Sequence, residues 1–73
     1  MYHIIETCMC PSGAYAKIQY SCAAEANVRK AFGRAAFEGP GFGILWSKTL
    51  QLIHSEHRNG ERLYEVLATR AIA

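Results

Sequence analysis

The stretch that decides the fold is residues 20–40, YSCAAEANVRKAFGRAAFEGP. Small and apolar side chains recur in residues 23–37 at helical spacing, which gathers them into one stripe. The opposite side of the expected helix is charged, and Glu25 precedes Arg29 by four residues, the spacing of a weakly stabilising ion pair. We therefore expect an amphipathic helix that packs this stripe inward. The stripe consists of Ala24, Val28, Ala31, Phe32 and Ala35.

Both ends of this helix carry recognisable signals. Ser21 is a candidate N-cap, because its hydroxyl can accept a hydrogen bond from an otherwise unpaired backbone N–H. Gly39-Pro40 predicts the end, since glycine favours the position after a helix and proline cannot continue it. The loop at residues 39–43 contains a G-x-G but lacks the wider dinucleotide-binding and P-loop patterns, so we interpret it as a connection.

The first hairpin precedes the helix. Residues 2–10 and 15–22 are rich in β-branched and aromatic side chains and predict two strands, with a turn at residues 11–14. With Ser12-Gly13 at the tip, Cys10 faces Tyr15. The expected core face then carries Ile5, Thr7, Met9, Ala16, Ile18 and Tyr20, and the other face carries Glu6, Cys8, Cys10, Lys17, Gln19 and Ser21.

The second hairpin follows the helix. Extended residues 44–57 and 63–72 flank Asn59-Gly60, a dipeptide that tolerates the positive φ values of tight turns. Because 73 residues leave no room for a second core, we expect one domain over residues 1–73. The predicted fold class is α+β: an antiparallel sheet of about four strands in the order β-β-α-β-β, with the helix packed on one face.

Two registers compete for the second hairpin. A two-residue Asn-Gly loop places Leu63 and Leu67 on the core face. A three-residue loop with Gly60 in the left-handed conformation sets Glu56 opposite Arg62 instead. We prefer the second register because it keeps the core face contiguous. That face then carries Leu50, Leu52, Tyr64, Val66 and Ala68.

The preferred register has a consequence for three large aliphatic side chains. Ile53, Leu63 and Leu67 then lie on the outer face of the sheet, where such a group favours a partner surface or a dimer contact. With the other register they belong to the core. The sequence leaves these two interpretations equal.

Composition indicates a cytoplasmic protein. The amino-terminal residues MYHIIETCMC lack the basic and apolar segments of a signal peptide. The apolar runs are far shorter than the roughly 20 residues that span a bilayer, so no membrane is expected. Three cysteines cannot all pair within one chain, which favours reduced thiols. A net charge of +2 is too small to require a polyanionic partner.

The cysteines and histidines do not form a convincing chemical site. Cys8 and Cys10 point to one side of a strand, but a closed zinc site needs four ligands and Cys22 is expected on the other face. His54 and His57 are three residues apart, which puts them on opposite sides of a strand. We therefore predict that the chain is not an enzyme and that it has no catalytic residues, no metal site and no cofactor.

Basic residues gather in two places. Arg29, Lys30 and Arg34 form a basic helix face, and Arg58 and Arg62 lie near the second turn. Such clusters can contact phosphates or steer association with an acidic protein surface. The candidate partner-binding residues are therefore Arg29, Lys30, Arg34, Arg58 and Arg62, together with Ile53, Leu63 and Leu67.

The layout of the chain resembles that of small inhibitor proteins encoded by phages and other mobile elements, anti-CRISPR proteins among them. In residues 20–30, YSCAAEANVRK, a strand runs into an alanine-rich helix as in several of those proteins. The resemblance covers the order of elements, and no residue role is carried over from it. It implies a protein that binds and blocks a larger nucleic-acid-processing complex through protein–protein contact.

Two functional hypotheses follow. The first is a non-enzymatic binding or inhibitor protein, either a phage or mobile-element anti-CRISPR protein or another host-takeover factor. The alternative is a small nucleic-acid-binding or regulatory protein that uses the basic helix face, with binding that weakens steeply as salt rises. Homodimerisation is compatible with both hypotheses and would help a thin core.

Overall fold

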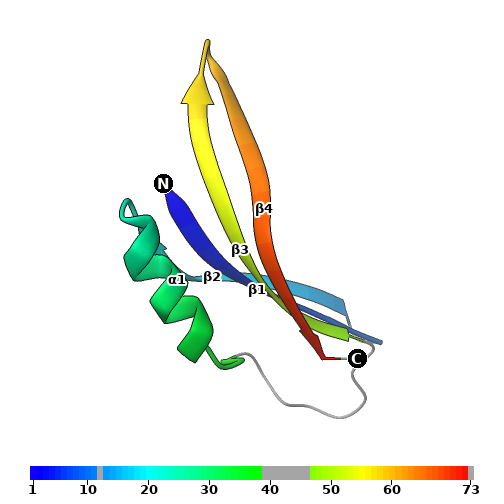
Figure 1. The fold of residues 1–73 in the computed structure, drawn as a ribbon. Coiled ribbons are helices and arrows are strands. Elements are labelled where there is room, and N and C mark those ends of the chain that lie inside the picture. Colours follow the sequence, from blue (N-terminus) through cyan, green and yellow to red (C-terminus); the bar gives the residue numbers. More distant parts are fainter. Residues whose placement is uncertain (12, 39–46, 73) are drawn as a thin grey trace.

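The computed structural model describes residues 1–11, 13–38 and 47–72. The first hairpin consists of β1 (Tyr2–Cys10) and β2 (Gly13–Cys22), and the second of β3 (Ser47–Arg58) and β4 (Glu61–Ile72). The helix α1 (Glu25–Arg34) stands between them in the chain. All strand pairs are antiparallel, and the sheet order is β2-β1-β3-β4 (Figure 1). The predicted α+β class and the β-β-α-β-β order are confirmed.

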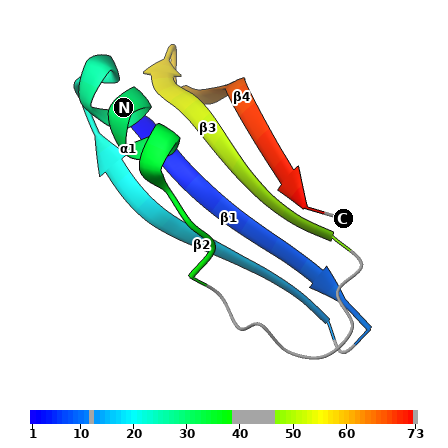
Figure 2. The ribbon, with the colours of Figure 1, turned by 60° about the horizontal axis from the view of Figure 1, so that its bottom comes forward.

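Helix α1 covers one side of the sheet, against β1 and β2 (Figure 2). The outer ends of β3 and β4 project well beyond it (Figure 1). The molecule is a thin slab of 42 × 27 × 15 Å. The predicted helix stop at Gly39-Pro40, the glycine-rich loop and residues 44–46 of the third predicted strand lie outside the described residues.

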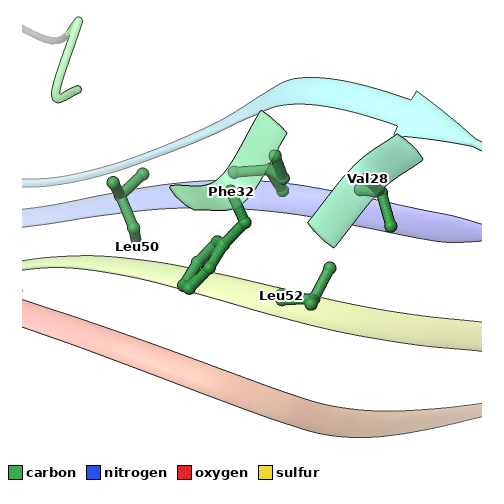
Figure 3. Packing of buried hydrophobic residues seen from close by; sticks show 5 residues of the cluster. Val28, Phe32, Leu50 and Leu52 are labelled. Carbon is green, nitrogen blue, oxygen red and sulfur yellow. The ribbon is translucent and has the colours of Figure 1, made fainter. Parts of the chain in front are cut away.

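The core forms where α1 meets β1 and β3. Val28 and Phe32 point from the helix toward the sheet and meet Leu50 and Leu52 of β3 (Figure 3). Ile4 of β1 completes the buried cluster. The predicted inward stripe is therefore confirmed at Val28 and Phe32, and its members Ala31 and Ala35 are partly buried against the same cluster.

The ends of α1 differ from the prediction. The N-cap residue is Ala24, without a side-chain capping bond, so the expectation for Ser21 is wrong. Strand β2 continues through Ser21 to Cys22, and the Ser21 hydroxyl is instead hydrogen-bonded to His3 Nδ1 at 2.7 Å. At the other end, Arg70 of β4 donates from Nη1 to the carbonyl oxygens of Phe32 and Ala35, both at 3.0 Å. A residue distant in sequence thus caps the helix.

The predicted core face of the first hairpin is wrong. Cys10 pairs with Gly13 and not with Tyr15, and the residues that β1 buries under the helix are Ile4, Glu6 and Cys8. Ile5, Thr7 and Met9, with Ala16 and Ile18 of β2, lie on the opposite face. Tyr20 departs from that set because a β-bulge at Gln19 pairs it with Ile4 on the helix side.

Glu6 is the physical reason for this error, since a carboxylate favours a solvent-facing prediction. Its side chain is fully buried and accepts hydrogen bonds from Gln19 Nε2 at 2.7 Å and from the backbone N–H of Glu38 at 2.6 Å. Such bonds offset the cost of burying a charged group. The face that contains Glu6 can therefore be the inner one.

The second hairpin adopts the register that we did not prefer. Asn59 and Gly60 have φ of 52° and 79°, and Arg58 pairs with Glu61 across a two-residue turn. Two consecutive positive φ values are the requirement of the tight hairpin turn that Asn-Gly satisfies best. Glu56 consequently faces Leu63 and not Arg62.

This register separates the three aliphatic residues predicted for the outer face. Ile53 lies there, as expected, and pairs with His3 and Val66. Leu63 lies on the helix side opposite Glu56, so its outer-face prediction is wrong. Leu67 is the extra residue of a bulge and packs against the core cluster, so its outer-face prediction is wrong.

Candidate functional site

The face of the sheet that α1 does not cover is called the open face. Side chains alternate along each strand, so the pairing identifies its members. They are His3, Ile5, Thr7 and Met9 of β1, Ala14, Ala16, Ile18 and Ser21 of β2, Ser47, Thr49, Gln51, Ile53, Ser55 and His57 of β3, and Arg62, Tyr64, Val66, Thr69 and Ala71 of β4.

Charge is distributed unequally between the two faces of the sheet. Among the charged residues of the described strands, Arg62 alone lies on the open face, next to the hairpin turn. The helix side carries all the others: Glu6, Lys17, Lys48, Glu56, Arg58, Glu61, Glu65 and Arg70. The charged side chains thus lie mainly on the helix side, while the open face takes its polar groups mostly from uncharged side chains such as serine and threonine.

His3 is the main polar group at the centre of the open face. Its Nδ1 lies 2.7 Å from Ser21 Oγ and its Nε2 lies 2.9 Å from Ser55 Oγ. Burial lowers the pKa of His3 below its ordinary value of 6.5, and the positive charges of the amino terminus and Arg62 act in the same direction. The ring is therefore neutral near pH 7, and both of its nitrogens are satisfied within the face.

A groove of about 500 Å³ lies on the other side of the molecule, between α1 and β2. We call it the α1–β2 groove. Arg34 lines it from the helix, and Tyr20, which is 39% exposed, lines it from β2. The remaining lining residues are Ile4, Gln19, Ala31, Ala35, Ala36 and Glu38. A second hollow of about 340 Å³ lies near Tyr15 and Cys8, and none of its described lining residues is charged.

The predicted basic helix face divides into two parts. Lys30 and Arg34 are one turn apart and share the side of the helix that borders the groove. Arg29 lies about 140° around the helix axis from Arg34. Its Nε is 2.7 Å from Glu25 Oε2, so the predicted pair of these two residues is confirmed. Among the described residues neither Lys30 nor Arg34 is in an ion pair.

The remaining predicted basic residues lie elsewhere. Arg58 and Arg62 flank the turn of the second hairpin, which projects beyond α1 (Figure 1). They point to opposite faces of that hairpin, and Arg58 is paired with Glu56 at 2.6 Å. The structure therefore does not bring them together with Lys30 and Arg34 into one surface.

The thiols and imidazoles remain dispersed. Cys8 and Cys10 lie at one end of β1, while Cys22 pairs with Tyr2 at the other end. All three lie on the helix side, so the prediction that Cys22 lies on the opposite face from Cys8 and Cys10 is wrong. The backbone N–H of Ala24 is the main cause that lowers the pKa of the Cys22 thiol. Within residues 1–11, 13–38 and 47–72, no group of three or more His, Cys, Asp or Glu side chains could hold a metal ion.

The two candidate histidines are separated as predicted. His54 lies on the helix side and stacks on Tyr2, with ring centroids 4.6 Å apart. His57 lies on the open face opposite Arg62.

Sequence reasoning missed two features of these surfaces. Gln19 and Tyr20 enter the groove because of the bulge in β2, which has no local signal in the sequence. The low charge of the open face, in contrast, follows from simple alternation once the correct inner face of β1 is known.

Comparison with family models, with curated proteins and with solved structures yields no significant match to this chain. In the described part of the chain, the helix is too short and too polar to cross a bilayer.

Proposed function

We propose that this chain is a non-enzymatic binding protein that engages an acidic surface of a partner protein through the α1–β2 groove. One observation carries the proposal: the groove joins a half-exposed tyrosine, Tyr20, to two basic residues, Arg34 at its wall and Lys30 one turn away. Tyrosine and arginine are the residue types that dominate binding energy at protein interfaces, especially where a pocket desolvates them.

The surrounding charges support the same partner chemistry. Lys17 and Glu38 neutralise each other at 2.7 Å beside the groove, which leaves Lys30 and Arg34 as its excess charge. Two cations, one in the lining of a groove of mixed polarity and one a helical turn away, favour carboxylates on the partner and accelerate encounter at low salt.

We further propose that the partner belongs to a nucleic-acid-processing complex and that binding blocks this complex in the cytoplasm. This step rests on the layout shared with small phage and mobile-element inhibitors, including anti-CRISPR proteins. The reducing conditions of that compartment would keep the three cysteines as thiols.

The test uses two double variants with the same change in charge. Lys30→Glu with Arg34→Glu reverses the charge at the groove, and Arg58→Glu with Arg62→Glu reverses it at the hairpin tip. Each tagged protein is used to capture partners from the native host, and the purified captured complex is then assayed for its own activity. We expect wild type and the tip variant to bind and inhibit the complex, and the groove variant to lose binding at least about tenfold.

Two results would contradict the proposal. One is equal inhibition by the groove variant. The other is retention of duplex or single-stranded DNA by the wild-type protein with affinity that falls steeply with salt, because that behaviour indicates direct phosphate contacts. The second result would favour the nucleic-acid-binding alternative.

A further inference from the structure

The open face is a surface of unusual composition for a sheet exposed to water. Its centre carries Ile5 and Ile53, and Ile53 is only 9% exposed. Around this centre, Ile18 is 59% exposed and Val66 is 52% exposed. Charged side chains are absent from its described positions except for Arg62 beside the turn. Depletion of charge at the centre with large apolar side chains around it is the composition of an interface core.

The imidazole of His3, at the centre of this face, does not oppose its burial. His3 forms its two hydrogen bonds sideways, to Ser21 on one neighbouring strand and to Ser55 on the other. A neutral imidazole with both nitrogens satisfied can be covered without the cost of an unpaired buried polar group. His3 can therefore lie beneath an apolar surface without losing a hydrogen bond.

We propose that a second copy of this chain covers the open face, so that two sheets pack face to face about a twofold axis. At its described positions the open face carries one charged side chain, Arg62 beside the turn, so its centre offers no ion-pair partner to a charged protein. A charged group buried against that centre would be costly. The open face of a second copy has the same chemistry and can therefore cover this surface. A twofold axis brings identical patches together, and packed sheets lie about 10 Å apart.

The dimensions of the molecule are sufficient for such a dimer. The slab of 42 × 27 × 15 Å offers a broad face of at most about 1,100 Å², and a standard interface buries roughly 800 Å² on each partner. Burial of the open face would stabilise the monomer, because its buried hydrophobic cluster comprises only five residues in the described part of the chain. Small domains with thin cores commonly gain stability by association.

Sedimentation equilibrium on the full chain tests the proposal. We expect the wild-type mass to approach twice 8.1 kDa as concentration rises through about 1 to 500 µM. Ile18→Lys and Val66→Lys each place a charge in the interface and should weaken association by at least about 100-fold. The matched control is Leu63→Lys, an exposed residue of the same strand as Val66 that faces the helix side opposite Glu56. This control should dimerise like wild type.

The outcomes separate clearly. A wild-type protein that stays monomeric over the whole range overturns the proposal, and so does dimerisation that Ile18→Lys and Val66→Lys leave unchanged. Circular dichroism checks that each variant is folded, and Ile18→Ser with Val66→Ser replaces the lysine variants if they unfold. The groove variant Lys30→Glu with Arg34→Glu should keep wild-type self-association. The dimer and the proposed partner site can therefore fail independently.

Discussion

At the scale of single residues, the buried polar groups of this protein are held by hydrogen bonds from other elements. Glu6 of β1 receives a bond from β2 and another from the segment after α1. The hydroxyl of Ser55, a residue that is almost fully buried, contacts His3 and the carbonyl oxygen of Met1. Because each donor or acceptor is met, these residues occupy positions that polarity alone would assign to the surface.

The lowered pKa of His3 predicts how stability depends on pH. The folded protein resists protonation of His3, whereas the unfolded chain binds this proton near the ordinary value of 6.5. The free energy of unfolding should therefore decrease as pH falls below 6.5. His3→Asn should flatten this part of the curve, which urea denaturation at several pH values measures. Wild-type and variant curves that run parallel would contradict the prediction.

At the scale of elements, helix α1 depends on the sheet for its ends. No side chain caps its N-terminus, and its C-terminal carbonyl oxygens at Phe32 and Ala35 are met by Arg70 of β4. A cation at a helix C-terminus is also favoured by the helix dipole. The strand farthest from β2 in the sheet thereby contributes to holding the helix over the core.

Removal of this contact should weaken the domain. Arg70→Ala deletes two hydrogen bonds from a guanidinium and should lower the free energy of unfolding by about 1–2 kcal/mol. Chemical denaturation followed by circular dichroism measures the change. Arg58→Ala is the matched control, since it removes an exposed ion pair with Glu56 that should contribute at most about 1 kcal/mol. An equal loss in both variants would argue against a specific role for Arg70.

At the scale of the whole molecule, one hydrophobic cluster between α1 and the sheet stabilises a broad and thin structure. Phe32 is its largest side chain and contacts the region of Leu50 and Leu52 (Figure 3). The two faces of the sheet differ in charge. The helix side carries the charges and the α1–β2 groove, and the open face is nearly free of charge.

Phe32→Ala should therefore affect the entire fold. Loss of this side chain, with the cavity that it leaves, should lower the free energy of unfolding by about 3–5 kcal/mol. A small domain has a total stability of about 5–15 kcal/mol, so the variant should be close to unfolding. Thermal denaturation measures the effect. The control is Leu63→Ala, because Leu63 is an exposed leucine on β4 and its loss should change the free energy of unfolding by about 0.5 kcal/mol or less. An unchanged melting temperature of the Phe32→Ala protein would show that Phe32 does not stabilise the core.

The sequence by itself determined the features that depend on local periodicity and turn chemistry. The helical spacing of Val28 and Phe32 specified the helix and its buried side, and Asn59-Gly60 specified a turn between two strands. Only the tertiary structure decided which face of β1 lies inward, because Ile4 and Ile5 give both faces of that strand an apolar residue and the position of α1 selects between them. The bulges at Gln19 and Leu67 likewise depend on pairing between strands, which no local pattern encodes.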